Sequence, residues 1–214
     1  MPLAAYLLGS ISFAWIAGRC KGIDLRAHGS GNLGATNAGR VLGGGWFAAV
    51  FCADVGKGVL PVLLARSLPA TFAVDADVTE HQILQIAAGG GAILGHVFTL
   101  FHRFRGGKAV ATSLGVLIGL MPALAGLCAL TWGLAWAVGA CLLHASRSAA
   151  VGPASVAAAL AAPAWWWLLI ADPLAEGARL RTAFVVLLSV LVVVRHRGNI
   201  ARLCTRRAKD AAKP

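Results

Sequence analysis

Residues 109–146 read AVATSLGVLIGLMPALAGLCALTWGLAWAVGACLLHAS and carry no charged side chain when His144 is neutral. A helix of about 20 apolar residues crosses a hydrocarbon core of about 30 Å. This block is too long for one such span, and Gly119 and Pro122 offer a natural break within it. We therefore predict two membrane-spanning helices here, at about 109–121 and 123–144.

Other uncharged blocks lie on both sides of this stretch, and the composition of the whole chain agrees with them. Of the 214 residues, 58% are hydrophobic and only 13% are charged, whereas about a quarter of the residues are charged in a typical soluble domain. The further spans that we predict lie at about 2–19, 46–66, 82–101, 152–171 and 180–195. The sequence thus predicts an all-α integral membrane protein with about seven transmembrane helices, in which residues 1–203 form a single polytopic domain and residues 204–214 form a basic tail.

The distribution of basic residues predicts the orientation. The first apolar block has no basic residue before it and is followed by Arg19, which favours a retained first span with its N-terminus outside. In that orientation the external loops hold few of the 19 Lys and Arg residues, namely Arg66, Arg179 and Arg181. Apart from Lys57, which lies inside a span, the others lie in or beside the loops 20–45, 102–108 and 145–151 and the C-terminal tail. The positive-inside rule therefore makes these loops and the C-terminus cytoplasmic.

Composition also excludes some function classes. The formal net charge is +11, but the basic residues lie between apolar blocks, where lipid head groups account for them, and no solvated basic domain remains for nucleic acid. The five cysteines include no CxxC pair, so they predict neither a metal site nor a cofactor. The chain also has no HxxxxD pair, nucleophile elbow or aspartate-rich motif, and thus no obvious general base.

A polar, glycine-rich segment follows the first predicted span, where residues 29–37 read GSGNLGATN. Glycine reaches backbone conformations closed to other residues, and successive N–H groups can then form an anion-binding nest. Side-chain donors accompany the glycines, and a following arginine adds a planar cation suited to phosphate. A flexible loop would use the same residue types, so this segment alone leaves both interpretations open. The candidate residues are Gly29, Ser30, Gly31, Asn32, Gly34, Thr36, Asn37 and Arg40.

Two further basic segments lie on the same predicted face. Residues 105–108 read RGGK just before a predicted span, where a glycine pair would expose helical N–H groups and the lysine would add a full charge. Residues 195–199 read RHRGN, in which the histidine could transfer a proton and the asparagine could orient it or a substrate hydroxyl. Basic residues also flank membrane spans in general, which is the alternative interpretation of both segments. The candidate residues are Gly106, Gly107, Lys108, Thr112, His196 and Asn199.

Asp54, Lys57 and His96 are ionisable residues that lie away from the ends of the predicted spans. Asp54 and Lys57 are three residues apart and share one helical face, where their charges can partly neutralise each other. His96 is a functional candidate because it lies within the membrane, but packing against a neighbouring helix explains it equally well.

Together these segments resemble the bacterial acyl-phosphate:glycerol-3-phosphate acyltransferases, small seven-span enzymes of phospholipid synthesis. The resemblance covers nearly the whole chain and is carried by KGIDLRAHGSGNLGATNAGRVLG at 21–43, DVGKG at 54–58, GHVF at 95–98, FRGGKAVAT at 104–112 and RHRGNIARL at 195–203. The chain departs from the family at several positions. Ser12 and Thr99 replace prolines, Ala109 replaces a glycine, Gly198 replaces an acidic residue, and residues 147–155 follow the family only loosely.

The resemblance implies transfer of a fatty acyl group from acyl phosphate to the 1-hydroxyl of glycerol 3-phosphate, which gives lysophosphatidic acid and inorganic phosphate without cofactor or metal. It also implies a multi-pass monomer in the lipid bilayer of the bacterial cytoplasmic (inner) membrane, with the active site facing the cytoplasm. Acyl phosphate is a mixed anhydride with a good leaving group, so catalysis needs positioning and charge stabilisation more than a strong base.

Each candidate residue then has an expected role. Ser30, Arg40 and Lys108, with the backbone of Gly106 and Gly107, are expected to hold phosphate groups. We expect a second set to shape the pocket and orient the glycerol hydroxyl, namely Asn32, Thr36 and Asn37. The last span contributes two residues that close the site, namely His196 and Asn199.

Other functions remain open on the residues alone. A transporter or channel for a phosphorylated solute could use the same loops, although no inverted repeat or chain of intramembrane charges supports it. A non-catalytic membrane-binding protein would not need two glycine-rich phosphate loops. A lipid transferase that uses acyl-coenzyme A is the third alternative.

Overall fold

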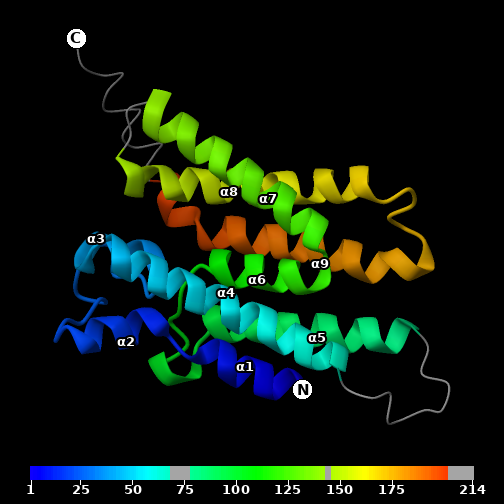
Figure 1. The fold of residues 1–214 in the computed structure, drawn as a ribbon, viewed down its shortest axis with the longest axis horizontal. Helices are drawn as coiled ribbons and strands as arrows, with labels where there is room; N and C mark the ends of the chain where they lie inside the picture. Colours follow the sequence, from blue (N-terminus) through cyan, green and yellow to red (C-terminus); the bar gives the residue numbers. More distant parts are fainter. Residues whose placement is uncertain (68–77, 143–145, 202–214) are drawn as a thin grey trace.

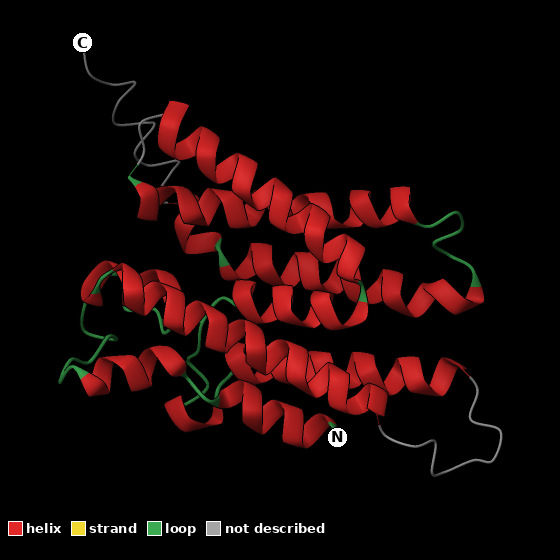
Figure 2. Cartoon of the chain, viewed as in Figure 1, coloured by secondary structure: helices red, strands yellow, loops and turns green. Residues whose placement is uncertain are grey.

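The computed structural model describes residues 1–67, 78–142 and 146–201, and every regular element within these ranges is a helix (Figures 1 and 2). In chain order the elements are α1 (Pro2–Ser10), α2 (Phe13–Cys20), α3 (Ala35–Leu42), α4 (Gly44–Ser67), α5 (Val78–Val97), the 3-10 turn η1 (Leu100–His102), α6 (Val110–Leu120), α7 (Pro122–Ala137), the π-helical turn η2 (Val138–Leu142), α8 (Arg147–Leu169) and α9 (Glu176–Arg195). The predicted all-α class is confirmed. The predicted basic tail, 204–214, lies outside the described residues.

Six stretches of the described chain are long and apolar enough to cross a membrane, namely Pro2–Cys20, Gly44–Ser67, Glu80–His102, Pro122–Leu142, Arg147–Leu169 and Glu176–Arg195. The break predicted within 109–146 is confirmed, because α6 ends at Leu120 and Pro122 begins α7. The helix α6 has 11 residues and is therefore about 16 Å long, roughly half of a hydrocarbon core. It is too short to span alone, so the predicted count of seven full spans is not confirmed.

The helices form two layers, with α6 between them (Figure 1). One layer contains α1 to α5, and the other contains α7, α8 and α9. Glycine permits the close crossings inside the first layer. A Cβ atom at Gly9 of α1 would meet the carbonyl oxygen of Ala92 on α5, and one at Gly95 of α5 would meet the carbonyl oxygen of Tyr6 on α1. Such small-residue crossings are typical of helices packed in lipid, where backbones approach closely.

The first predicted span is divided at Ile11, and Lys57 stabilises this break. The Nζ atom of Lys57 donates a hydrogen bond of 2.7 Å to the carbonyl oxygen of Ile11 and lies 2.8 Å from Oδ1 of Asp54. The predicted pairing of Asp54 with Lys57 is thus confirmed. A backbone carbonyl released by a helix break inside a membrane needs a donor from the protein. The Oγ atom of Ser12 also accepts a hydrogen bond of 3.2 Å from the N–H of Trp15, which caps α2.

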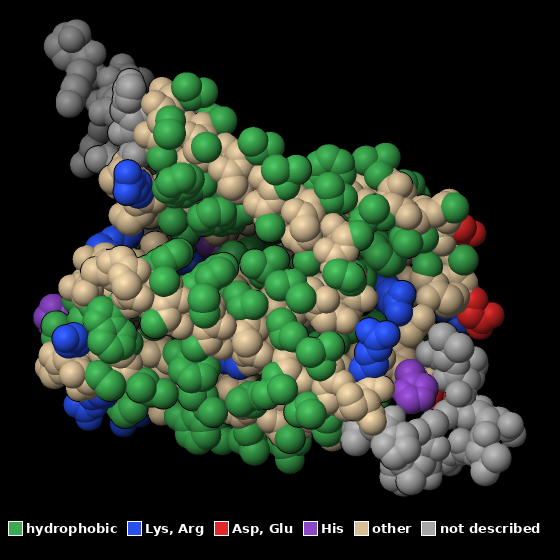
Figure 3. Space-filling model, in the orientation of Figure 1, with side chains coloured by type: hydrophobic (Ala, Val, Ile, Leu, Met, Phe, Trp, Pro, Cys, Tyr) green, Lys and Arg blue, Asp and Glu red, His purple; other side chains and the backbone are tan. Residues whose placement is uncertain are grey.

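The surface carries a broad apolar belt. On the face shown in Figure 3, hydrophobic side chains cover most of the middle of the molecule, and charged side chains lie mainly toward its two ends. Many large hydrophobic side chains are exposed, among them Leu3, Leu142, Leu168 and Leu187. A contiguous apolar surface of this extent is unfavourable in water and is expected of a lipid-facing belt. The protein is an integral membrane protein.

Candidate functional site

The three predicted polar segments meet at one end of the molecule around a cavity of about 130 Å³. The wall of this cavity is formed by α3 and the loop before it, the start of α6, the start of α8 and the segment after α9, with further side chains from α4, α5 and α7. From the predicted set it includes Ser30, Asn32, Gly34, Thr36, Asn37, Arg40, Lys108, His196 and Asn199. In Figure 3 a hollow opens between the two layers, with basic and histidine side chains at one end of it. We refer to this site as the polar cavity.

Asn37 holds the GSGNLGATN loop in its shape. Its Oδ1 atom accepts a hydrogen bond of 2.7 Å from the N–H of Ser30, and its Nδ2 atom donates to the carbonyl oxygens of Leu25 and His28, both at 3.1 Å. The side chain is almost fully buried. Although Asn37 lies at the cavity wall, its amide group is therefore occupied within the loop. Asn37 therefore shapes the pocket, which is one part of its predicted role, while its amide group is bonded to the loop rather than directed at a substrate hydroxyl.

The glycines of this loop adopt the predicted conformations at two positions. Gly29 and Gly31 have φ values of +62° and +70°, in the left-handed region that favours glycine. Neither residue belongs to the cavity wall. The N–H groups of Ser30 and Gly31 donate to Asn37 and His28 within the loop. The structure thus assigns these amides to loop closure rather than to the predicted anion nest.

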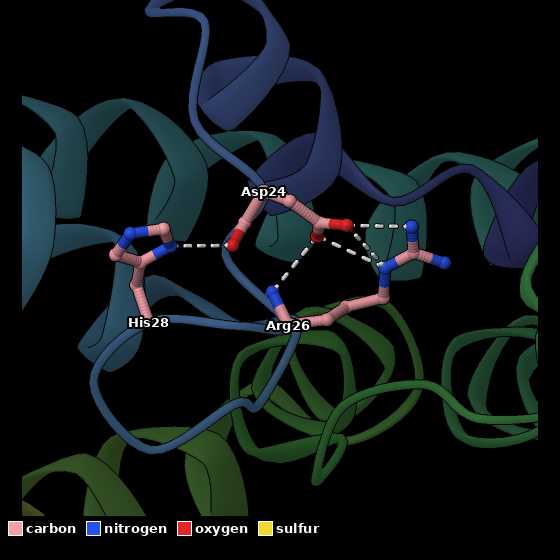
Figure 4. A network of polar contacts seen from close by, with 3 residues as sticks. All are labelled: Asp24, Arg26 and His28. Atoms are coloured by element: carbon pink, nitrogen blue, oxygen red, sulfur yellow. Dashed lines mark hydrogen bonds and ion pairs between the residues drawn. The ribbon is translucent and has the colours of Figure 1, made fainter.

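A compact network fixes the preceding turn (Figure 4). The guanidinium group of Arg26 donates to both carboxylate oxygens of Asp24, with an Nη2–Oδ2 distance of 2.7 Å and an Nε–Oδ1 distance of 2.9 Å. The Nδ1 atom of His28 donates to the carbonyl oxygen of Asp24 at 2.9 Å. Hydrogen bonds from the Arg26 side chain lower the pKa of Asp24 well below its usual value. Because this pair is solvent-exposed, its main effect is on the shape of the loop.

The start of α3 contributes an electrostatically favourable wall for an anion. Gly34, Ala35 and Thr36 all line the cavity, and no side chain caps the N-terminus of this helix at Gly34. The first N–H groups of a helix lack partners inside the helix and carry a partial positive charge. A phosphate in the cavity could accept hydrogen bonds from them. The exposed side chain of Arg40, one turn further along α3, adds a full charge to the same wall.

The glycine pair of RGGK serves close packing. The N–H of Gly106 donates to the carbonyl oxygen of Val97, and the N–H of Gly107 donates to that of His96, both at 3.0 Å. The Nη2 atom of Arg195 donates to the carbonyl oxygens of both glycines, at 3.3 and 3.0 Å. A Cβ atom on either glycine would collide with His96. Both N–H groups are thus engaged with the end of α5 in this structure, whereas the sequence pattern predicted phosphate binding for them.

Lys108 is the residue that this packed segment presents to the cavity. Its Nζ atom donates a hydrogen bond of 2.7 Å to Oδ1 of Asn199. Gly152 on α8 makes room for this partner, because a Cβ atom there would meet Nδ2 of Asn199. The predicted association of the RGGK and RHRGN segments is thus observed. It holds the ammonium group of Lys108 at the cavity wall.

His196 lies at the C-terminal end of α9 with its ring buried. Its Nδ1 atom is 2.8 Å from the carbonyl oxygen of Val192. A carbonyl can only accept, so Nδ1 carries a proton and Nε2 holds the lone pair in the neutral ring. Burial lowers the pKa of His196, and the positive charges of Lys108 and Arg195 lower it further. The neutral form is therefore favoured near pH 7.

A buried group of ionisable side chains lies behind the cavity. The Nδ1 atom of His96 is 3.6 Å from Oδ1 of Asp54, which is also paired with Lys57. Asp54 and His96 both reach the cavity wall, and the imidazole ring lies against Gly107. His96 therefore links α4 to the glycine pair, in agreement with the interpretation of a packed histidine.

An apolar groove continues from the polar cavity and has a volume of about 290 Å³. It lies between α4, α6, α7, α8 and α9, and the two spaces share Phe47, Phe51, Val110, Trp132 and Ser155 in their walls. The rest of the groove is lined by Ser113, Leu114, Leu117, Cys128, Ala129, Ala158, Ala159, Ala162, Leu188, Ser189 and Val192. We refer to this space as the apolar groove.

Two residues near the start of α6 have structural roles that the sequence did not indicate. Thr112, predicted to bind substrate, is fully buried where α6 crosses Gly58 of α4 and does not belong to the cavity wall. Ala109 precedes α6 with φ +65° and ψ +5°, a left-handed conformation that costs an L-residue roughly 1–2 kcal/mol. This geometry explains why a glycine suits the family pattern at the position.

Several wall residues lie outside the predicted set. Residues from the segment 147–155, whose role was open, face the cavity as Ser148, Val151, Gly152 and Ser155. They come from the first three turns of α8 and lie on one face of the helix, but small and apolar residues of these types are common throughout membrane helices. Nothing in the sequence indicated that Phe47, Phe51 and Trp132 line the cavity, because an aromatic residue in a membrane span usually faces lipid or a neighbouring helix.

Comparisons with known proteins show the family to which this chain is similar. Residues 1–206 match the glycerol-3-phosphate acyltransferase family. A glycerol-3-phosphate acyltransferase of Gloeobacter violaceus is 41% identical over 201 residues, which cover 94% of this chain and 88% of the relative. One of Desulforudis audaxviator is 36% identical over 200 residues, which cover 93% and 88% respectively.

A solved structure supports the same assignment. The crystal structure of PlsY, an integral membrane glycerol 3-phosphate acyltransferase, in its glycerol 3-phosphate form superimposes with a TM-score of 0.76. The sequence identity is 34%, and the match covers 96% of this chain and 91% of the PlsY chain. The match therefore extends over nearly the whole chain. This chain belongs to the glycerol-3-phosphate acyltransferase family.

Proposed function

We propose that this protein transfers a fatty acyl group from acyl phosphate to the 1-hydroxyl of glycerol 3-phosphate, releasing lysophosphatidic acid and inorganic phosphate. Acylation of glycerol 3-phosphate as a step of phospholipid synthesis follows from family membership. The acyl-phosphate donor and the position of acylation are the parts that we add.

The observation that carries this proposal is the continuity of the two spaces. A polar cavity walled by Arg40, Lys108 and the N-terminus of α3 leads directly into the apolar groove, and Trp132 and Ser155 line both. An acyl phosphate has the same division, with a charged head joined to an apolar chain. The head would lie with glycerol 3-phosphate in the polar cavity, and the chain would lie in the groove.

The wall residues suit a reaction between two phosphate-bearing substrates. Arg40 and Lys108 offset the charge that both bring into the cavity, and the N-terminus of α3 provides backbone donors. Ser30, Asn32 and Thr36 supply neutral donors that fix the glycerol backbone near the acyl carbonyl. Alignment of this kind contributes most where no strong base is required.

The bond changes balance without a protein nucleophile. The 1-hydroxyl oxygen attacks the acyl carbonyl carbon, the bond between that carbon and the bridging phosphate oxygen breaks, and inorganic phosphate leaves. We propose that the hydroxyl proton passes to a substrate phosphate. Asn199 then holds Lys108 in place, and His196 closes the cavity wall beside the reacting groups.

We further propose that this end of the molecule faces the cytoplasm in the bacterial inner membrane, and that a monomer suffices. Basic segments gather near the polar cavity at the ends of α2, α3 and α9, as the positive-inside rule requires of a cytoplasmic face. One chain supplies residues of all three polar segments to the polar cavity, which supports a monomer.

A panel of donors tests the proposed reaction. Purified protein is incubated with glycerol 3-phosphate and palmitoyl phosphate, palmitoyl-acyl carrier protein or palmitoyl-coenzyme A, and both lipid product and phosphate are measured. We expect turnover with palmitoyl phosphate and equal amounts of lysophosphatidic acid and phosphate. Preference for either other donor overturns the proposal. Transport of glycerol 3-phosphate into liposomes without acylation would instead support the transporter alternative.

A further inference from the structure

The apolar groove ends abruptly, and we propose that Ala162 and Trp166 at its closed end set the longest acyl chain that this enzyme uses efficiently. This inference rests on the proposed acyl-phosphate reaction. It adds chain-length selection to that reaction and assigns it to a few residues of α6, α7, α8 and α9.

The direction of the groove is defined independently by several helices. On α8 the wall shared with the polar cavity is at Ser155, and the last groove residue is Ala162. On α6 the corresponding residues are Val110 and Leu117. Each pair is seven residues apart, which corresponds to about 10 Å along a helix. The groove thus runs about 10 Å from the polar cavity into the apolar core.

Beyond that depth four of the five helices that line the groove present a buried side chain. The residues one turn further are Leu120 on α6, Leu124 on α7, Trp166 on α8 and Val185 on α9, and all belong to one packed hydrophobic cluster. Four helices thus close the groove at the same level. A chain that reaches this level meets packed side chains rather than continuing space.

Trp166 is the largest residue of this closed end and is held firmly. It is 4% exposed, and its Nε1 atom donates a hydrogen bond of 2.8 Å to Oγ1 of Thr182. Thr182 in turn donates 2.6 Å to the carbonyl oxygen of Pro173. The indole ring is therefore held by Thr182 of α9, which is itself bonded to Pro173 in the loop between α8 and α9. Displacing it for a longer chain would break this arrangement, because packed interiors accommodate added volume poorly.

The small side chains of α8 create the open space itself. Ala158, Ala159 and Ala162 form one wall of the groove, and larger side chains there would occupy it. Burial alone gives little discrimination in a membrane, because lipid tails are as apolar as the groove. Selection therefore comes from steric exclusion at the closed end, which a single alanine can adjust.

The test uses acyl phosphates from octanoyl to stearoyl with glycerol 3-phosphate and the full-length protein in detergent or nanodiscs. Ala162→Leu should lower kcat/KM for the chains that reach the closed end, lauroyl and longer, by about tenfold or more, while octanoyl phosphate, which ends short of Ala162, stays within about twofold of the wild type. Ala164→Leu is the matched control on the same helix, since Ala164 is exposed and outside the groove. Its chain-length profile should equal that of the wild type.

A second variant covers the case in which Ala162→Leu does not fold. Leu188→Ala enlarges the deep end and should raise the ratio of stearoyl to myristoyl turnover several-fold. If Ala162→Leu folds and slows all chain lengths equally, or if Leu188→Ala leaves the ratio unchanged, the inference is overturned. If the wild type uses no acyl phosphate of any length, the proposed function fails instead.

Discussion

The two glycine-rich segments of this protein have similar composition but different roles. The GSGNLGATN loop lines the polar cavity with Ser30, Asn32 and Thr36. The glycines of RGGK turn inward, and their backbone groups are bonded to α5 and to Arg195. Only Lys108 of that segment faces the cavity. A glycine pair beside a basic residue therefore does not by itself indicate a backbone anion site.

The difference follows from burial. A loop at the membrane surface can leave its amides to solvent or ligand, whereas a loop packed against helices must satisfy them internally. Gly106 and Gly107 pack against His96, so their amides bond to the end of α5. The following predictions test this division between cavity donors and packing residues.

The largest effect is expected at Lys108. Lys108→Ala removes a cation from the polar cavity and should lower kcat/KM by about 100-fold or more, while thermal stability changes little. Release of phosphate from palmitoyl phosphate with glycerol 3-phosphate measures this. Lys108→Arg is the control for charge and should retain part of the activity. Near-normal turnover by purified Lys108→Ala would contradict the site that we describe.

Asn37→Ala should act mainly through stability. It removes three hydrogen bonds from a buried amide and leaves their partners unpaired, which costs about 2–3 kcal/mol of unfolding free energy. Thermal unfolding in detergent, followed by tryptophan fluorescence, measures the loss. Asn32→Ala is the comparison within the same loop and should reduce activity while the unfolding temperature stays close to that of the wild type. The reverse pattern would show that we have exchanged their roles.

Gly107→Ala should also destabilise, because its methyl group would collide with the ring of His96. Overpacking of this kind costs about 1–3 kcal/mol, and the unfolding temperature should fall accordingly. Gly44→Ala is the matched control at the start of α4, where an added Cβ meets nothing within 4 Å. A stable Gly107→Ala enzyme with a raised KM for phosphate substrates would instead favour a direct role in binding.

The smallest effect is expected at Ala109, and it has the opposite sign. Ala109→Gly relieves the left-handed conformation at φ +65° and should add about 1 kcal/mol of stability. The unfolding temperature would then rise by a few degrees. If Ala109→Gly is no more stable than the wild type, the left-handed conformation of Ala109 carries no measurable free-energy cost.

Several features were predictable because they depend on composition and local pattern. Uncharged blocks predicted the helical membrane class, Pro122 predicted the division between α6 and α7, and the spacing of Asp54 and Lys57 predicted their ion pair. The candidate residues Ser30, Asn32, Arg40 and Lys108 do line one cavity. Polar residues in an apolar chain are few, so those that occur in clusters are readily recognised.

Other features depend on contacts between distant segments. The short length of α6, the burial of Thr112 and the wall formed by Ser148 and Gly152 follow from packing against other helices. Their residue types are common in membrane helices and have no local signal.

The sequence by itself determined that the chain is helical and membrane-embedded and which polar segments are available for chemistry, because hydrophobicity, charge and glycine content act locally along the chain. The tertiary structure alone decided which backbone amides of those segments line the cavity, which are hydrogen-bonded to other parts of the chain, and where the apolar groove ends. Those outcomes depend on which side chains meet across α5, α8 and α9, and no single segment contains that information.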